Sequence, residues 1–329
     1  MTQKKILYAI NGTGQGHISR AKSLIPYLQK YVNVDILISG KLQNLNFDFP
    51  IKYEYKGFTF HYEDGAVNWF KTLLKADIFQ FITDIRSLDL SEYDLIVTDF
   101  EPVSAWCSFI NKYRCINVSH QASFYSYKSP RPWFWPFFIL AELFFRFYSV
   151  SNDYLGVHFK AYSEKIFPPV LKDEIIQATP KTKPHITVYL SAFSLEQQIQ
   201  FFNLFPEFNF HIFHSHCTQK QQKEHLSLSP LSEDFKFSLI SCSGYISNGG
   251  FESNAEALYL KKPLLSIPIR NQYEQYCNGA ALKKLGVTVI KRLHYKKVFH
   301  WLQTRKTLSQ LQVCNTDDLA KAISHAIDT

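Results

Sequence analysis

Short apolar runs alternate with helix-like segments along most of the chain, and this alternation constrains the fold more than any other feature. Residues 5–10 (KILYAI) are typical of a buried parallel strand, and apolar side chains recur at helical spacing over residues 18–28. Strands are also expected within residues 33–40, 93–100 and 114–121, and a helix over 104–113. This order predicts an α/β fold with a doubly wound parallel sheet, whose ligands lie at the carboxyl ends of the strands.

A second unit of the same kind follows a proline-rich connection. Prolines at 168, 169, 180 and 184 punctuate that connection, after which strand signals over 185–191 and 208–213 flank a helix signal over 194–205. A length of 329 residues also suits two domains. We therefore expect a first domain over residues 1–165, a linker over 166–184, a second domain over 185–314 and a capped C-terminal helix over 315–329.

A glycine loop ends the first strand. Gly12, Gly14 and Gly16 precede His17, which stands where the first helix begins. Closely spaced glycines allow a tight turn or the close approach of a ligand. The loop lacks the Gly-Lys-Ser/Thr ending of a P-loop and the Gly-x-Gly-x-x-Gly spacing of a dinucleotide fingerprint. A histidine beside it suggests general-base chemistry, because imidazole exchanges protons near neutral pH.

The second half carries a longer motif, NGGFESNAEAL, over residues 248–258. A strand signal leads into Gly249 and Gly250, and a helix is expected to begin near Glu252. Free backbone N–H groups at a helix N-terminus suit a diphosphate. Glu256 lies about one turn inside that helix, where its carboxylate can accept hydrogen bonds from ribose hydroxyls. The motif therefore predicts a nucleotide site.

The two motifs together resemble the nucleotide-sugar glycosyltransferases of GT-B architecture. The Gly-x-Gly-His loop is paired with Asn-Gly-Gly, Glu-Ala-Leu, Pro-Leu-Leu, Gln-Tyr and Asn-Gly-Ala segments, as in the UDP-glycosyltransferases and the lipid II-forming N-acetylglucosaminyltransferase. DFEP at 99–102 and HQ at 120–121 are similar to an uncharacterised bacterial and archaeal branch. The resemblance covers most of the chain and implies two Rossmann-like domains that face a central cleft.

That resemblance implies an inverting transferase in which His17 deprotonates a hydroxyl of the acceptor. The donor is then a nucleotide-sugar, expected to be UDP-linked and held by the second domain. The implied contacts are Gly14, Gly16, Ser191, Gly249, Gly250 and Phe251 for the diphosphate, Glu256 for the ribose, Phe235 for the base, Asn271, Glu274 and Gln275 for the donor sugar, and Asp99, Glu101, His120 and Gln121 for the acceptor. The loop that contains Ser191 reads YLSAFS and lacks the glycines of the relatives.

No Asp-x-Asp pair of the kind that holds a divalent metal in the other common glycosyltransferase architecture occurs in this sequence. We expect no metal and no cofactor besides the substrates, with helix N–H groups stabilising the leaving diphosphate. Two alternatives remain: a GT-B sugar-nucleotide epimerase, and a non-catalytic protein that binds nucleotide-sugars or nucleic acid.

Charge and cysteine content indicate the partner and the compartment. The formal charge of +8 suggests an anionic partner. Aromatic residues do not alternate with Arg and Lys in a recognised nucleic-acid motif, so nucleic acid is not the expected partner. Six cysteines without a Cys-x-x-Cys pair fit free thiols in a reducing cytosol, and no signal peptide is recognised.

One aromatic-rich segment, residues 130–150 (PRPWFWPFFILAELFFRFYSV), has two interpretations. It forms a helix of the first domain's core, or its Trp and Phe side chains enter a membrane interface with Lys128 and Arg131 nearby. Glu142 and Arg146 interrupt the apolar run, which argues against a membrane-spanning helix. The second interpretation predicts a peripheral enzyme on the cytoplasmic face of an anionic membrane, with a lipid-linked acceptor.

Overall fold

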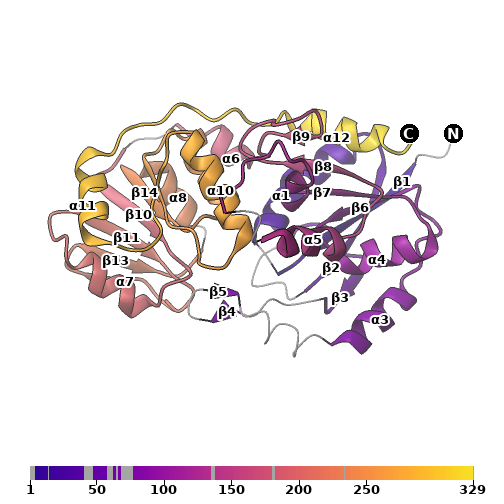
Figure 1. Cartoon of the computed structure of the whole chain (residues 1–329), viewed down its shortest axis with the longest axis horizontal. Coiled ribbons are helices and arrows are strands. Elements are labelled where there is room, and N and C mark those ends of the chain that lie inside the picture. Colours follow the sequence, from indigo (N-terminus) through magenta and orange to yellow (C-terminus); the bar gives the residue numbers. More distant parts are fainter. Residues whose placement is uncertain are drawn as a thin grey trace.

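The computed structural model describes residues 4–13, 15–40, 47–57, 62–63, 66–67, 77–134, 138–179, 182–232 and 234–328. Figure 1 shows two α/β units side by side, with the first half of the chain on the right and the second half on the left. The C-terminal segment crosses back from the second unit to the first. The predicted pair of doubly wound units is confirmed.

The first sheet is parallel throughout its described strands. Its spatial order is β3 (Tyr53–Tyr55), β2 (Asn33–Ser39), β1 (Lys5–Asn11), β6 (Leu95–Asp99), β7 (Cys115–Ser119), β8 (Asp153–Val157) and β9 (Ile166–Phe167). The winding direction reverses between β1 and β6, which opens a crevice at their carboxyl ends. A separate antiparallel pair joins β4 (Tyr62–Glu63) to β5 (Ala66–Val67).

Helices cover both faces of this sheet because β1 is apolar on both sides. Ile6, Tyr8 and Ile10 pack in the cluster that contains α1 (Gln15–Leu28), whereas Leu7 and Ala9 face α3 (Ile78–Ser87) and α4 (Pro102–Asn111). The short 3₁₀ helix η1 (Gln121–Tyr125) follows β7. This two-sided burial explains why the strand reads as a continuous apolar run.

The second sheet has the order β12 (Gln221–Lys223), β13 (Leu226–Ser229), β11 (Asn209–Phe213), β10 (His185–Tyr189), β14 (Gly244–Ser247), β15 (Leu264–Ser266) and β16 (Thr288–Val289), and only its edge strand β12 is antiparallel among the described strands. Phe202 of α7 (Leu195–Phe202) and Trp301 of α11 (Tyr295–Thr304) pack in one cluster of this domain. Apolar side chains of α8 (Asp234–Ser241), α9 (Glu252–Tyr259) and α10 (Tyr273–Lys284) belong to the cluster that also contains β1 and α1 of the first domain.

The connections between the domains differ from the expected boundaries. The predicted linker 166–184 contains strand β9 of the first sheet and helix α6 (Asp173–Ile176). The expected C-terminal helix forms as α12 (Thr316–His325), with the Asn315 side chain accepting a hydrogen bond from the Asp317 N–H at 3.3 Å. It packs on α1 of the first domain, where Tyr31 donates to the Asp317 carboxylate at 2.9 Å. The first and last described elements, β1 and α12, therefore belong to the same domain (Figure 1).

The aromatic segment forms helix α5 (Ile139–Tyr148), which has one packed side and one exposed side. Phe145 and Tyr148 are buried, and Phe138 stacks on Tyr273 of α10 with ring centroids 5.3 Å apart. Several large apolar side chains of the segment are exposed: Trp133, Ile139, Leu140, Leu143 and Phe147. Trp135 and Phe137 lie outside the described residues. Within the described part of the chain, no helix combines the length and apolar character needed to cross a bilayer.

Candidate functional site

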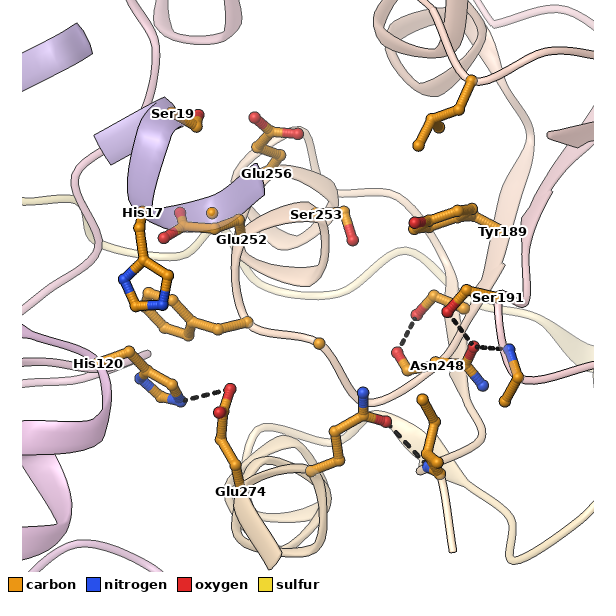
Figure 2. A pocket seen from close by; sticks show the side chains of 18 of the residues that line it. His17, Ser19, His120, Tyr189, Ser191, Asn248, Glu252, Ser253, Glu256 and Glu274 are labelled. Atoms are coloured by element: carbon orange, nitrogen blue, oxygen red, sulfur yellow. Dashed lines mark hydrogen bonds and ion pairs between the residues drawn. The ribbon is translucent and has the colours of Figure 1, made fainter. Parts of the chain in front are cut away.

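A cleft of about 2820 Å³ lies between the two domains, at the carboxyl ends of both sheets. The first domain lines it with the start of α1 and the segments that follow β1, β6 and β7. The second domain lines it with the segments that follow β10, β14 and β15 and with the start of α9. This is the location that the doubly wound topology predicts. Figure 2 shows the cleft with side chains from both domains pointing into it.

His17 and Asp99 form a hydrogen-bonded pair on the first-domain side. His17 Nδ1 lies 2.7 Å from Asp99 Oδ1, and the His17 side chain is 13% exposed whereas Asp99 is fully buried. The two meet because α1 starts directly after β1 and β6 is the neighbour of β1 in the sheet. With Nδ1–H donating to the carboxylate, Nε2 is the nitrogen that can take a proton from a ligand.

Arg20 completes this group one turn further along α1. Its Nε donates to Asp99 Oδ2 at 3.0 Å and its Nη2 to Asp99 Oδ1 at 2.7 Å. Burial acts to raise the pKa of Asp99, but the charge of Arg20 and the contact with His17 outweigh burial and hold this pKa below its ordinary value. Asp99 is therefore a carboxylate that orients the His17 ring.

The start of α9 faces this group from the second domain. Helix α9 begins at Glu252, and the preceding residue, Phe251, makes no side-chain cap, so the first-turn N–H groups are open to a ligand. A Cβ on Gly249 would lie 3.0 Å from the Gln275 carbonyl oxygen, whereas a Cβ on Gly250 would meet nothing within 4 Å. Gly249 thus permits close packing, and Gly250 borders open space in the cleft.

The residues expected to hold the nucleotide gather on the same side of the cleft. Glu256 is buried beside Lys172, with the Lys172 Nζ 3.4 Å from Glu256 Oε1, and burial raises the pKa of Glu256. Phe235 lines the cleft and packs edge-on against Tyr189, with ring centroids 5.6 Å apart. Ser191 also lines the cleft and donates a 3.3 Å hydrogen bond to Asn248 Oδ1 (Figure 2).

The three residues expected at the donor sugar have different surroundings. Glu274 lines the cleft and accepts a 3.0 Å hydrogen bond from Gln121 Nε2. Gln275 also borders the cleft, but its Oε1 accepts from the N–H groups of Gly249 and Ile269, each at 2.9 Å, so this amide oxygen orders the backbone. Asn271 is exposed, has φ of 60° and is not one of the residues that line the cleft.

Of the residues expected to contact the acceptor, Glu101 has a structural position. It is fully buried, and its carboxylate caps α4 by accepting from the N–H groups of Val103 at 2.7 Å and Ser104 at 2.8 Å. Burial raises its pKa despite these hydrogen bonds. Glu101 does not line the cleft, because the local helix start takes up both oxygens.

His120 and Gln121 lie at the contact between the domains. His120 contacts the Val157 carbonyl oxygen through Nδ1 at 2.7 Å and the Asn278 Oδ1 through Nε2 at 2.8 Å. Its ring also stacks on Phe251 with centroids 4.0 Å apart, and burial lowers its pKa. Both residues border the cleft, but their side chains already contact Glu274 of the second domain. Figure 2 shows His120 directed at Glu274. Gly14 lies outside the described residues.

Sequence reasoning missed Arg20 and Glu252. Arg20 follows His17 by three residues, so helical spacing alone places both on one side of α1. Glu252 stands inside the recognised motif, but its partner Arg20 belongs to the other domain and cannot be found from local spacing. The two side chains join at 2.6 Å between Arg20 Nη1 and Glu252 Oε1.

The sequence profile described as Glycosyl transferase family 1 matches residues 4–304. The chain belongs to this family. It is therefore a glycosyltransferase that uses a nucleotide-sugar, and the resemblance inferred from the two glycine motifs is confirmed. No curated protein sequence matches the transferase significantly.

Solved structures agree on the GT-B fold of this transferase. A UDP-glucosyltransferase from Polygonum tinctorium capable of glucosylating indoxyl superposes with a TM-score of 0.60 at 12% identity, over 100% of both chains. MurG from Acinetobacter baumannii gives 0.58 at 15% identity, over 98% of this chain and 99% of its own. A UDP-N-acetylglucosamine 2-epimerase candidate from Listeria monocytogenes gives 0.64 at 10% identity, over 100% and 98%. At these identities the likeness establishes the fold alone.

Proposed function

We propose that this glycosyltransferase is an inverting, metal-independent enzyme that moves a sugar from a UDP-sugar to a hydroxyl group. The observation that carries the proposal is the His17–Asp99 pair, whose histidine lines the cleft together with the start of α9. A base and a diphosphate site on opposite sides of one cleft are the two parts that a direct displacement at an anomeric carbon needs.

In this proposal His17 Nε2 removes the proton of the acceptor hydroxyl as its oxygen attacks the anomeric carbon. The sugar–phosphate bond breaks on the opposite face, and the UDP leaves with the bonding electron pair. Asp99 stabilises the imidazolium that forms, because its charge lies 2.7 Å from Nδ1. The first-turn N–H groups of α9 stabilise the charge that develops on the diphosphate.

The second domain supplies the donor contacts. Glu256 accepts from the ribose hydroxyls, Phe235 lies against the base, and Glu274 faces the sugar. Ser191, Gly250 and Phe251 border the diphosphate. Their common support is that each lines the cleft on the α9 side.

The test is a thermal-shift panel of UDP-, GDP- and TDP-sugars, followed by a transfer assay with the donor that binds. A bound donor raises the melting temperature by mass action, and UDP-sugars are expected to raise it most. Incubation with a UDP-sugar alone tests the epimerase alternative. This alternative is considered because the Listeria epimerase candidate is a structural neighbour. An epimer formed without acceptor would contradict the transferase proposal. Tight DNA binding at modest salt would contradict the assignment of the positive charge to a nucleotide-sugar.

For the acceptor we propose a lipid-linked alcohol at the cytoplasmic face of an anionic membrane. Helix α5 and the preceding turn expose Trp133 at 85%, Leu140 at 76% and Phe147 at 62%. Lys128, two residues before the aromatic segment, is exposed as well. Aromatic and aliphatic side chains beside a cation favour attachment to an anionic lipid surface.

Flotation with vesicles of phosphatidylcholine and phosphatidylglycerol tests this acceptor proposal. Wild type should float, and a variant with Trp133, Leu140 and Phe147 all changed to Ser should stay folded and remain at the bottom. A matched variant with the exposed Leu204 and Phe237 of the second domain changed to Ser should float like wild type. Wild type that stays at the bottom would contradict the membrane proposal and favour a soluble acceptor.

A further inference from the structure

Arg20 is a buried cation that belongs to the first domain but reaches the second. Its side chain is 2% exposed, and Nε and Nη2 are both held by Asp99. Nη1 extends across the cleft to Glu252 Oε1 at 2.6 Å. Since a guanidinium carries five N–H groups, Nη1 keeps a second N–H beyond the one given to Glu252. The Arg20 fork is thus held by Asp99 on one edge and by Glu252 on the other, and it borders the cleft.

Glu252 occupies a position that a carboxylate makes unfavourable for an anionic ligand. It is the first residue of α9, so its charge stands beside the N–H groups that would receive a diphosphate. Its side chain is 19% exposed and passes Gly16 so closely that a Cβ there would lie 2.8 Å from Glu252 Cγ. Figure 2 shows Glu252 reaching from α9 toward the start of α1, where His17 lies. Glycine at position 16 leaves the space through which Glu252 approaches Arg20.

We propose that Glu252 is a placeholder for the donor diphosphate: it occupies Arg20 Nη1 in the absence of donor and releases this group to a phosphate oxygen when the nucleotide-sugar binds. The inference rests on the proposed donor site. It makes Arg20 a donor-binding residue contributed by the first domain. The same guanidinium then contacts the leaving diphosphate and the carboxylate that orients the base, so donor binding and alignment of His17 depend on one side chain.

The released carboxyl group stays next to the diphosphate and therefore has to take up a proton. Burial raises the pKa of Glu252 to about 7, with Glu256 and Asp99 adding to the increase and Arg20 and Lys172 opposing it. His17, which contacts Arg20 Nη2 at 3.1 Å, is the other titratable group at this point. When Arg20 pairs with the phosphate instead, Glu252 loses a positive neighbour that lowers its pKa. The protonated form of Glu252 is then favoured further. Donor binding is accordingly coupled to proton uptake, which approaches one proton only at pH values above the pKa of Glu252.

The competing explanation is a latch, in which the Arg20–Glu252 pair closes the domains and helps the donor to bind. The variant Glu252→Gln separates the two explanations by the sign of its effect. A latch predicts weaker donor binding in the variant, because the ion pair is lost. A placeholder predicts tighter binding at pH 8, because the competing charge is gone. The control Glu174→Gln removes another carboxylate that borders the cleft and is paired with Lys236.

The experiment is calorimetry of UDP-glucose, UDP-N-acetylglucosamine and GDP-mannose at pH 6, 7 and 8. Their diphosphates have no proton that titrates in this range. For a carboxyl group of pKa about 7 that must be protonated in the complex, wild-type affinity should fall about tenfold between pH 6 and 8. Glu252→Gln should lack that part of the pH dependence and bind roughly tenfold more tightly than wild type at pH 8, whereas Glu174→Gln should follow wild type.

Each other outcome has a defined meaning. Weaker or equal donor binding in Glu252→Gln at pH 8 would overturn the placeholder proposal. It would not contradict the proposed donor site. A pH profile of Glu252→Gln that matches wild type would overturn it as well. Failure of all three nucleotide-sugars to bind wild type would refute the proposed function, and the placeholder with it.

Discussion

Replacing Asp99 by asparagine is the most direct test of how the base is oriented. Asp99 is fully buried at the end of β6, accepts two hydrogen bonds from Arg20 and contacts His17 Nδ1 at 2.7 Å. Asparagine has nearly the same shape but no charge, and its NH₂ group cannot accept a hydrogen bond. One of the contacts to Arg20 or His17 therefore becomes repulsive, and the buried guanidinium loses its main counter-charge.

The expected effects can be scaled from the burial of this group. Removing one partner of a buried ion pair costs about 3–5 kcal/mol of unfolding free energy. For a domain of this size, that loss lowers the melting temperature by roughly 10 °C. Misorientation of the base should reduce kcat by roughly 10²-fold or more, which is the usual contribution of general-base catalysis.

The assay measures melting temperature and kcat for donor transfer, well below the melting transition of the variant. Glu101→Gln is a matched control, because Glu101 is a buried carboxylate two residues further along that caps α4 and does not line the cleft. It should lose about 1 kcal/mol of stability, as expected for a weakened helix cap, and keep its kcat. Asp99→Asn with more than about a tenth of the wild-type kcat would show that Asp99 does not orient the base. An unchanged melting temperature would refute the ion-pair reasoning.

Three further predictions follow from the cleft. His17→Ala should lower kcat by roughly 10²-fold or more while calorimetry finds donor affinity nearly unchanged, and retention of turnover would argue against a base. Glu256→Ala should weaken donor binding by roughly 10- to 150-fold, the equivalent of about 1.5–3 kcal/mol for a charge-assisted hydrogen bond. An unchanged dissociation constant would show that Glu256 does not bind the ribose. The pKa of Glu252 rises from 4.5 to about 7 on folding, so wild-type stability should fall as pH increases through that window. Thermal melts between pH 4.5 and 8 should show Glu252→Gln losing less stability than wild type. Parallel stability curves for the two proteins would contradict the raised pKa.

Much of the fold could be predicted because it depends on residues that are close in sequence. The apolar run before Gly12 forms β1. The Asn-Gly-Gly segment follows β14 and leads into α9. The alternation of apolar residues, the glycines of turns and the starts of helices are local properties. They can therefore be predicted without knowing which elements pack against each other. The family resemblance added the order of the two domains and the cleft between them.

The role of Glu101 shows where local reasoning ends. Its position after β6 beside Asp99 suggests a cleft residue, since strand ends point toward ligand sites in such folds. The chain instead turns at Phe100, which has φ of 53°, and Glu101 then takes the cap position of α4. One residue separates Asp99 from Glu101, but the turn sends their carboxylates to different partners. Helix α5 is a second example. Its aromatic composition does not predict which of its side chains pack on α10.

Sequence alone thus determined the two α/β units, the glycine turns and the histidine at the start of α1, since each follows from short-range spacing. Tertiary structure decided the electrostatics of the cleft. His17 and Arg20 come from α1, Asp99 from β6 and Glu252 from α9. Their contacts require the β1–β6 pairing and the placement of α9 against α1. Burial and opposing charge then set the direction of each pKa shift. These terms depend on distances across the fold, which no local pattern encodes.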